Sequence, residues 1–298
     1  MTAKIIDGKA IADRLRAEYR LRVGDLQSRH GVTPALAVIL VGDNPASRSY
    51  VRGKIAGCKQ VGIRSELIEL PASVGEGELL ARIQALNDDP SIHGILVQLP
   101  LPPQIRVASV VEHISVEKDV DGFHLYNMGG LVTGNTVFSP CTPYGVQKIL
   151  ELERIPVEGR NVVVVGASNL VGKPTALMLM QQEATVSICH IKTRDLGQYT
   201  LLADILVVAA GVPNLIVPQM VRTGAVVIDV GFNRLPDGRI VGDVDFDRVK
   251  EKASYITPVP GGVGQMTVTM LLHNTILSAQ RVASGQFVSR FSVGQALA

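Results

Sequence analysis

The segment at residues 162–173, which reads VVVVGASNLVGK, constrains the fold more than any other part of the chain. Its run of valines predicts a strand that is buried on both faces, as in a parallel sheet covered by helices. A tight turn follows at Gly166, Ala167 and Ser168, and Gly172 then opens an apolar helix. A strand, a glycine turn and a helix N-terminus present unpaired backbone N–H groups to an anion, usually the pyrophosphate of a nucleotide. The segment therefore predicts a nucleotide cofactor.

Two familiar phosphate-binding motifs fit this segment only in part. The dinucleotide fingerprint G-x-G-x-x-G becomes G-x-S-x-x-x-G, with Ser168 in place of the second glycine. A P-loop requires Ser or Thr after its Gly-Lys pair, and Pro174 stands there instead. A doubly wound domain without a cofactor remains an alternative, because glycine turns after strands also serve packing.

The strand expected at residues 185–189 bears on which nucleotide binds. An NAD site usually carries an Asp or Glu near the end of this strand, where it holds the ribose 2′-hydroxyl. The chain instead reads HIKTR over residues 190–194, without an acid. Lys192, Thr193 and Arg194 suit a 2′-phosphate and favour NADP, although a solvated basic loop has the same composition.

Composition excludes several classes of function. At 298 residues the chain is long enough for two domains. A net charge of +2 gives no electrostatic support for binding nucleic acid. Three separated cysteines without a C-x-x-C motif fit neither a disulfide framework nor a zinc site, so we expect a cytoplasmic protein without a metal. Charged residues near the start exclude a signal-peptide core, and no apolar run is long enough to span a membrane.

Strands and helices alternate along most of the chain, which predicts an α/β protein with mainly parallel sheets. We expect strands at residues 35–41, 63–70, 93–99, 185–189, 204–210 and 225–230, and another around 255–257. We expect helices between Asn44 and Gly62, at 76–88, 105–114 and 266–280, and one that Thr142 caps. Residues 119–142 lose this periodicity and are the best candidate hinge.

The hinge divides the chain into two expected domains with a cleft between them. The first covers residues 1–139, together with a C-terminal helix at about 276–298. The second covers residues 140–275 and is a Rossmann-like parallel-sheet domain. The segment PVPGGVG at residues 258–264 combines stiffening prolines with open glycine amides, which suits either a loop lying on a ligand or a tight structural turn.

A second group of candidate ligand-binding residues lies in the first domain. Tyr50 and Lys54 are four residues apart and share one helix face, beside Gly53. Gln98 interrupts the apolar run ILVQLPLP, and a buried amide must find hydrogen-bond partners. Asp121 stands in the hinge. The alternatives are a surface lysine stacked on Tyr50, a glutamine that ties loops together, and an Asp-Gly turn.

Together, several segments resemble the bifunctional methylenetetrahydrofolate dehydrogenase/methenyltetrahydrofolate cyclohydrolase family. They occur in consistent order from about residue 2 to 280 and read YVRGK, GILVQLPLP, KDVDGF, PCTPYGV, VVVVGASNLVGKP, VIDVGFN and ITPVPGGVGQMT. The resemblance implies oxidation of 5,10-methylenetetrahydrofolate with NADP (NAD being possible) and hydrolysis of the methenyl product to 10-formyltetrahydrofolate. It also implies a cytoplasmic homodimer. The rivals are a monofunctional dehydrogenase and a nucleotide-binding module without catalysis.

The resemblance also implies roles for residues of the first domain. Lys54 is similar to the family's catalytic lysine, which must be neutral for part of the cycle to act as a base. Gln98 resembles the residue that orients this lysine, and Tyr50 the one that packs on the aminobenzoate ring. Asp121 resembles the carboxylate that binds the pterin. The implied folate contacts further include Leu99, Pro260, Gly261 and Gly262.

On the cofactor side, the resemblance assigns the phosphate turn to Gly166, Ala167 and Ser168. It places Phe232 at a cofactor contact, through its backbone, and Thr267 beside the nicotinamide amide. The chain departs from the family at two positions. Ile191 occupies a position where Arg or Ser often grips the 2′-phosphate, so Lys192 or Arg194 must compensate if NADP is bound. Gln265 stands where the family usually has Pro.

Overall fold

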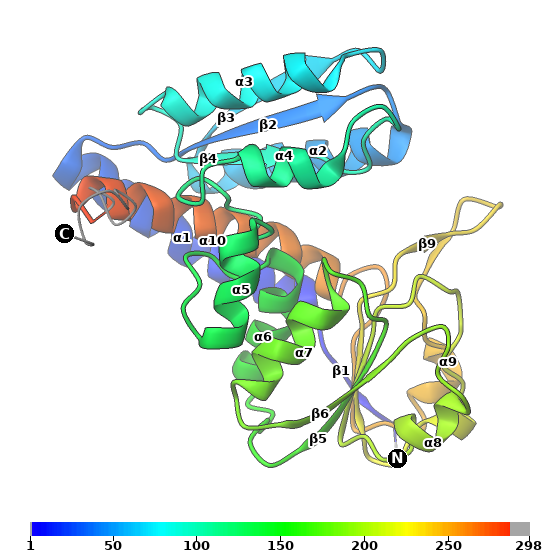
Figure 1. Cartoon of the computed structure of the whole chain (residues 1–298). Helices are drawn as coiled ribbons and strands as arrows, with labels where there is room; N and C mark the ends of the chain where they lie inside the picture. Colours follow the sequence, from blue (N-terminus) through cyan, green and yellow to red (C-terminus); the bar gives the residue numbers. More distant parts are fainter. Residues whose placement is uncertain (1, 287–298) are drawn as a thin grey trace, which may run out of the picture. The chain divides into compact units, whose positions relative to one another are not determined.

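The computed structural model describes residues 2–286, and these form two compact units (Figure 1). One unit contains the chain up to Leu15 together with Asn127–Met270, and we call it the nucleotide unit. The other contains Arg16–Tyr126 and the described chain from Leu271 onward, and we call it the lysine unit. Residues up to Leu15 and residues 127–139, which we expected in the first domain, therefore pack with the expected second domain. The end of the expected C-terminal helix, from residue 287, lies outside the described residues.

The nucleotide unit is built on a six-stranded parallel sheet. Its strands lie in the order β1 (Lys4–Ile5), β11 (Tyr255–Ile256), β8 (Val226–Asp229), β7 (Ile205–Val208), β5 (Asn161–Val165) and β6 (Thr185–Cys189). The valines of β5 are buried on both faces, as the sequence predicts. Because all strands are parallel, the turns after β5, β7 and β8 meet at one edge of the sheet.

Several further helices and a hairpin belong to this unit. They are α6 (Cys141–Leu152), α7 (Gly172–Met180), α8 (Leu196–Thr200), α9 (Phe246–Val249), the 3₁₀ turn Pro218–Met220 and the antiparallel pair β9 (Asn233–Arg234) and β10 (Ile240–Val241). Helices α6 and α7 pack side by side (Figure 1). The expected cap at Thr142 is wrong: α6 begins at Cys141, so Thr142 and Pro143 lie in its first turn, where backbone N–H groups have no intrahelical acceptor and proline is tolerated.

The candidate hinge contains a helix that the sequence did not predict. Helix α5 (Leu125–Thr133) lies within residues 119–142. Asn127 is fully buried there, and its Oδ1 accepts hydrogen bonds from the amides of Val137 at 2.9 Å and Phe138 at 3.0 Å. These hydrogen bonds hold the following loop against α5. The helix is therefore stabilised by contacts within the folded protein, and its sequence lacks the apolar period from which a helix is predicted.

The lysine unit contains a three-stranded parallel sheet in the order β3 (Arg64–Leu70), β2 (Ala35–Val41) and β4 (Gly94–Val97). Helices α3 (Glu76–Asp88) and α4 (Val107–His113) share an apolar core with alternate residues of β2. Helix α2 (Pro45–Val61) lies on the other side of β2 from α3 (Figure 1). Asn44 caps α2 by accepting from the amides of Ala46 and Ser47, and Gly62 ends it in the left-handed conformation, as predicted.

Two long helices, α1 (Gly8–His30) and α10 (Val263–Ala283), contribute to both units. In the lysine unit, the rings of Tyr19 and His273 lie 5.6 Å apart. The Asn274 side chain donates to the Val120 carbonyl at 2.8 Å, and Ser278 donates to the Glu117 carbonyl at 3.1 Å. These hydrogen bonds hold α10 against the segment that carries Asp121.

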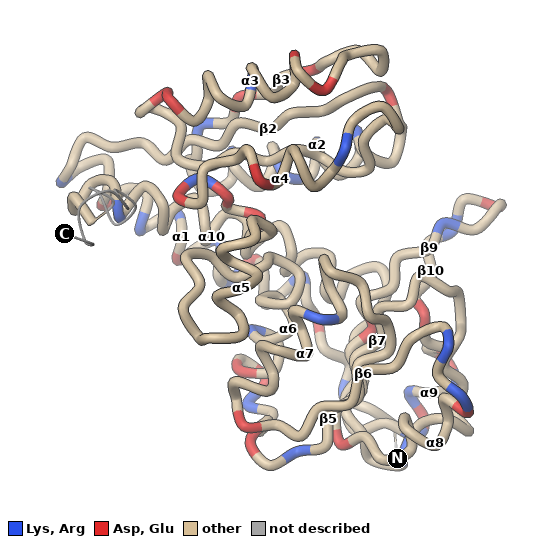
Figure 2. Tube along the Cα trace, in the orientation of Figure 1, with Lys and Arg blue, Asp and Glu red and all other residues tan. Residues whose placement is uncertain are grey.

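In the part of the chain that the structure describes, charged residues of both signs are interspersed along both units, without a long band of one sign (Figure 2). Among residues 2–286, no helix has the length and apolar character needed to cross a lipid bilayer.

Candidate functional site

The structure brings Lys54 and Gln98 into contact in the lysine unit. Lys54 lies on α2, the helix after β2, and Gln98 follows directly on β4, the strand that pairs with β2. The Lys54 Nζ atom donates a hydrogen bond to Gln98 Oε1 at 3.0 Å. The Gln98 amide donates in turn to the Leu99 carbonyl at 2.6 Å. Since Gln98 is only 9% exposed and its backbone amide is held by Ile39 at 2.9 Å, it presents its oxygen to the lysine from a fixed position.

Two other predicted folate residues, Tyr50 and Asp121, belong to this unit as well. Tyr50 precedes Lys54 by one helical turn on α2 and is 41% exposed. Gly53 leaves open space, because a Cβ added there would meet nothing within 4 Å. Asp121 is half-buried, directly after Val120, whose carbonyl accepts the bond from Asn274. No described contact joins Asp121 to Lys54 or Gln98.

In the nucleotide unit, the turn after β5 requires glycine. Gly166 has a φ of +118°, and a Cβ there would lie 2.1 Å from the Ala209 carbonyl oxygen. A Cβ on Gly172 would lie 1.9 Å from the Gly166 carbonyl oxygen. Gly166 therefore allows the turn to approach the backbone of the loop after β7. Gly172 allows the start of helix α7 to approach the backbone of the turn.

The same turn leaves amides available to an anion. Ser168 Oγ accepts from the amides of Val171 at 3.2 Å and Gly172 at 3.3 Å, which satisfies the first turn of α7. Within residues 2–286, no group accepts a hydrogen bond from the amides of Ala167, Ser168 and Asn169. Free amides at the start of a helix of nine residues suit a phosphate group, so these residues fit a bound nucleotide.

The segment after β6 forms a compact exposed turn. The His190 amide donates to Thr193 Oγ1 at 2.8 Å, and the Lys192 amide donates to His190 Nδ1 at 3.2 Å. Ile191 is 96% exposed and makes no packing contribution. Thr193 is thereby engaged within the turn, whereas the side chains of Lys192 and Arg194 have no ion-pair partner among the described residues.

The predicted ligand-binding loop and Thr267 lie in this unit as well. The Val259-Pro260 peptide bond is cis, and Gly261 has a φ of +109°. The Gly261 carbonyl accepts from the Lys9 amide at 3.0 Å, and a Cβ on Gly262 would lie 2.6 Å from the Pro258 carbonyl oxygen. Thr267 Oγ1, on α10, lies 3.0 Å from Thr142 Oγ1 on α6. Phe232 follows β8 and is 44% exposed.

Sequence reasoning missed two buried carboxylates at the edge where the strands end. Asp229 is the last residue of β8 and is 2% exposed, and Asp243 is fully buried. Burial, and secondarily the charge of Asp243, raise the pKa of Asp229 to about 7, against hydrogen bonds from three backbone amides that lower it. Asp229 ends the apolar run AVVID, and this pattern could have identified it. Gln98 was identified in the same way, as a polar residue within an apolar run.

The raised pKa predicts a pH-dependent stability. Between about pH 4 and pH 7 the folded protein keeps a proton on Asp229 that the unfolded chain has lost, so this contribution to stability disappears as pH rises. A pKa of about 7 in place of 3.8 corresponds to about 4 kcal/mol in total. We expect the unfolding free energy of the wild type, relative to Asp229→Asn, to decline from pH 5 to pH 7 and then level off.

Urea titrations of both proteins at each pH measure this difference. His93, whose pKa burial lowers to about 4, titrates in the wild type and the variant alike, so its effect cancels in the comparison. A difference that stays constant over the range contradicts the prediction.

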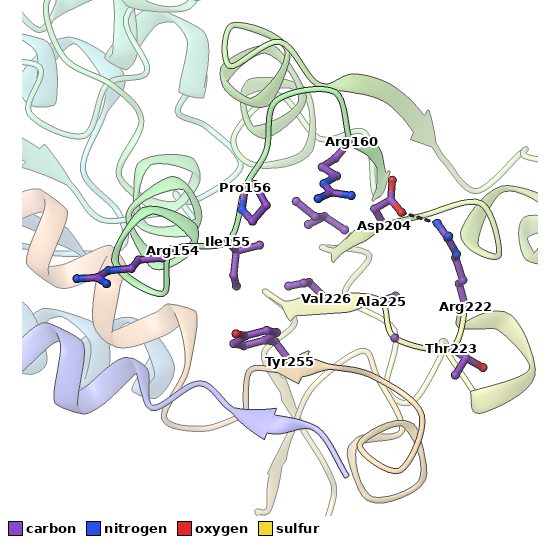
Figure 3. A pocket seen from close by; sticks show the side chains of 12 residues that line it. Arg154, Ile155, Pro156, Arg160, Asp204, Arg222, Thr223, Ala225, Val226 and Tyr255 are labelled. Atoms are coloured by element: carbon purple, nitrogen blue, oxygen red, sulfur yellow. Dashed lines mark hydrogen bonds and ion pairs between the residues drawn. The ribbon is translucent and has the colours of Figure 1, made fainter. Parts of the chain in front are cut away.

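A pocket lies at the opposite edge of the nucleotide unit's sheet (Figure 3). It is lined by residues at the starts of β5, β7, β8 and β11, among them Arg160, Val226 and Tyr255. The Arg222 guanidinium pairs with Asp204 at its rim. Ligands of open α/β sheets bind outside the carboxyl ends of the strands, so this pocket is not the nucleotide site.

Comparison with known proteins agrees with this geometry. Residues 6–121 match the model of the tetrahydrofolate dehydrogenase/cyclohydrolase catalytic domain, and residues 140–283 match the NAD(P)-binding domain of the same family. Bifunctional protein FolD of Nitrosospira multiformis is 59% identical over 94% of this chain and 97% of its own. The crystal structure of bifunctional FolD from Campylobacter jejuni shares 52% identity with a TM-score of 0.92, over 94% of this chain and 99% of that one.

A further solved structure, described as the Trypanosoma brucei methylenetetrahydrofolate dehydrogenase-cyclohydrolase complexed with NADP cofactor and inhibitor, is 38% identical. It covers 95% of this chain and 99% of its own, with a TM-score of 0.91. Both domain models match in the expected order and together span most of the sequence. The chain belongs to the tetrahydrofolate dehydrogenase/cyclohydrolase family.

Proposed function

We propose that this protein oxidises 5,10-methylenetetrahydrofolate to the methenyl cation with NADP, and then hydrolyses that cation to 10-formyltetrahydrofolate. The observation that carries the proposal is the 3.0 Å hydrogen bond from Lys54 Nζ to Gln98 Oε1, within the part that matches the catalytic domain. A monofunctional dehydrogenase would not require an amine in this position, because hydride transfer depends on the orientation of the reactants more than on proton transfer.

The chain's residues divide the work between binding and proton transfer. We assign the folate contacts to Tyr50, Leu99 and Asp121, with Asp121 as acceptor for the pterin amino group and ring N–H. The loop at Pro260, Gly261 and Gly262 supplies further folate contacts. A carboxylate can accept two parallel hydrogen bonds from such a donor pair, which fixes the orientation of the ring.

In the hydrolysis, Lys54 acts as the general base. Its uncharged amine takes a proton from the water that attacks the amidinium carbon. The ammonium group so formed then gives that proton to the pterin ring nitrogen as the bond between this nitrogen and the carbon breaks. Gln98 accepts a hydrogen bond from Nζ and so keeps the amine in one position. Gln98 is uncharged, so it holds Nζ through a hydrogen bond without forming an ion pair.

The nucleotide unit supplies the residues that hold NADP. The free amides of Ala167 and Ser168 suit the pyrophosphate, beside Gly166. Lys192 is the residue that we assign to the 2′-phosphate, because the neighbouring Ile191 has no polar group. We further assign the Phe232 backbone and Thr267 to the nicotinamide end. When bound, NADP accepts the hydride from the methylene carbon.

One assay tests both activities together. The purified protein is given 5,10-methylenetetrahydrofolate with NADP or NAD, and both the reduced cofactor and the methenyl absorbance are followed. We expect reduction of NADP in preference to NAD, with the methenyl intermediate decaying faster than in buffer. Reduced cofactor with decay at the buffer rate would support the monofunctional dehydrogenase, and no turnover at all would support a nucleotide-binding module.

Removal of the Asp121 carboxylate should weaken folate binding selectively. We expect Asp121→Ala to raise the Kd for a folate analogue about tenfold to a hundredfold, the range for a lost hydrogen bond to a charged group. The Kd for NADP should change by less than about twofold. Titration of both ligands measures the two constants, and Asp25→Ala, an exposed acid on α1, is the control. Equal losses for both ligands contradict the assignment.

We also propose that the protein is a cytoplasmic homodimer, as the family resemblance implies. Sedimentation equilibrium of the full chain measures its mass in solution, and a monomer mass at micromolar concentration would refute the dimer. Fractionation of the source cells tests the location.

A further inference from the structure

The carboxylate of Asp243 holds two loops of the nucleotide unit together. Its Oδ2 accepts from the amides of Ala210 at 2.7 Å and Gly211 at 2.8 Å, in the loop after β7. Its Oδ1 accepts from Asn233 Nδ2 at 2.8 Å, in the segment after β8. Asp243 is fully buried, and the described structure gives it no ion-pair partner, so these three donors are its compensation for burial.

Asp229 forms a similar junction beside it. Its Oδ1 accepts from the amides of Gly231 at 2.9 Å and Asp243 at 3.1 Å, and its Oδ2 accepts from Val244 at 3.0 Å. A Cβ on Gly231 would lie 2.3 Å from Asp243 Oδ1, and one on Gly242 would lie 1.9 Å from Asp229 Oδ2. The two glycines therefore let both carboxylates lie directly against the backbone.

This network borders the residues assigned to NADP on two sides. The Ala209 carbonyl packs against Gly166 of the phosphate turn, and the next two amides are the ones that Asp243 holds. On the other side, Phe232 lies between Gly231, which Asp229 holds, and Asn233, which donates to Asp243. The positions of both cofactor-facing segments are thus set by one pair of acids.

We propose that Asp243, acting with Asn233 and Asp229, is a positioning residue that sets the phosphate turn and the Phe232 segment for NADP binding. This proposal rests on the proposed function, because it takes the occupant to be NADP. It assigns to Asp243 no contact with the cofactor. Its effect is to keep two loops, which leave the ends of the paired strands β7 and β8, at the spacing that one nucleotide requires.

Exchange of the acid and the amide tests the proposal. Asn233→Asp alone places a carboxylate where a donor lay 2.8 Å from Asp243, and like charges in a buried site repel. We expect it to raise the Kd for NADPH, measured by fluorescence titration, about tenfold or more. The double variant Asn233→Asp, Asp243→Asn restores an amide facing a carboxylate, with the amide oxygen of residue 243 still available to the Ala210 and Gly211 amides. It should bring the Kd back to within about threefold of the wild type.

The hydrolysis of methenyltetrahydrofolate without NADP separates positioning from unfolding of the nucleotide unit, since it needs no cofactor but uses the folate contacts that we assign to Pro260, Gly261 and Gly262 of that unit. We expect each variant to keep this rate within about twofold, and exposed Asp247→Asn serves as the matched control. If Asn233→Asp alone fails to fold, Asp243→Asn alone provides the same test. We expect Asp243→Asn to weaken NADPH binding, and we expect the addition of Asn233→Asp to restore it.

The outcomes differ clearly. Unchanged NADPH affinity in both single variants, or a double variant no better than the singles, overturns the proposal. Loss of hydrolysis in proportion to loss of binding also overturns it, because the residues would then act on folding alone. A wild-type protein that does not bind NADPH contradicts the proposed function instead.

Discussion

Replacement of Lys54 by alanine is expected to abolish hydrolysis of methenyltetrahydrofolate above the rate in buffer. General-base catalysis contributes about 10²- to 10⁴-fold, and within the described structure no second amine or imidazole hydrogen-bonds to Gln98. The loss should therefore be at least about a hundredfold. Dehydrogenase activity should decline less, because hydride transfer depends on how the folate is held. Decay of the methenyl absorbance in the purified variant measures the first effect, and reduction of NADP measures the second.

Lys59→Ala is the matched control for this prediction. Lys59 lies on the same helix, is exposed, and belongs to the last turn of α2. Its removal deletes the same charge without touching Gln98, so hydrolysis should stay within about twofold of the wild type. Hydrolysis by Lys54→Ala at the wild-type rate would refute the role assigned to this amine.

Replacement of Gly166 by alanine is expected to remove most of the affinity for NADP. The φ of +118° is strained for any residue with a Cβ, and the added atom would lie 2.1 Å from the Ala209 carbonyl oxygen. Backbone atoms cannot rotate out of the way, so the turn must move and carry the free amides of Ala167 and Ser168 with it. We expect the Kd for NADPH to rise about a hundredfold, which corresponds to about 3 kcal/mol.

The control for this change is Gly129→Ala, in helix α5 of the same unit. A Cβ there would meet nothing within 4 Å, and alanine is the better helix former, so stability should hold or improve slightly. Direct NADPH titration and thermal unfolding of both variants compare the two effects. Wild-type affinity in Gly166→Ala would show that the turn does not hold the nucleotide.

The elements that local chemistry defines were predictable from the sequence. Strand β2 spans Ala35–Val41 and helix α3 spans Glu76–Asp88, both as expected, because a run of buried β-branched and apolar residues and a clear helical period identify them. The two ends of helix α2 were predicted correctly, because each depends on one residue. The Asn44 side chain caps the first amides, and Gly62 ends the helix in the left-handed conformation.

Elements whose stability comes from distant contacts were not predictable. Helix α5 depends on Asn127, which holds the amides of Val137 and Phe138 from inside the unit. The start of α6 was misplaced by two residues, because Thr142 is a residue type that often caps helices but its hydroxyl lies beside Thr267. A polar residue in a turn does not reveal which of its possible partners is near.

The sequence by itself determined the α/β class, the glycine turn after β5 and the family, because these depend on residue types in a fixed order. It also singled out Lys54 and Gln98 separately. Only the tertiary structure decided that they meet, since they are 44 residues apart and the parallel pairing of β2 with β4 brings their positions together. The carboxylates of Asp229 and Asp243 were hidden for a further reason. Five of the six donors that compensate their burial are backbone amides, which every residue except proline possesses, so residue types carry no trace of the contact.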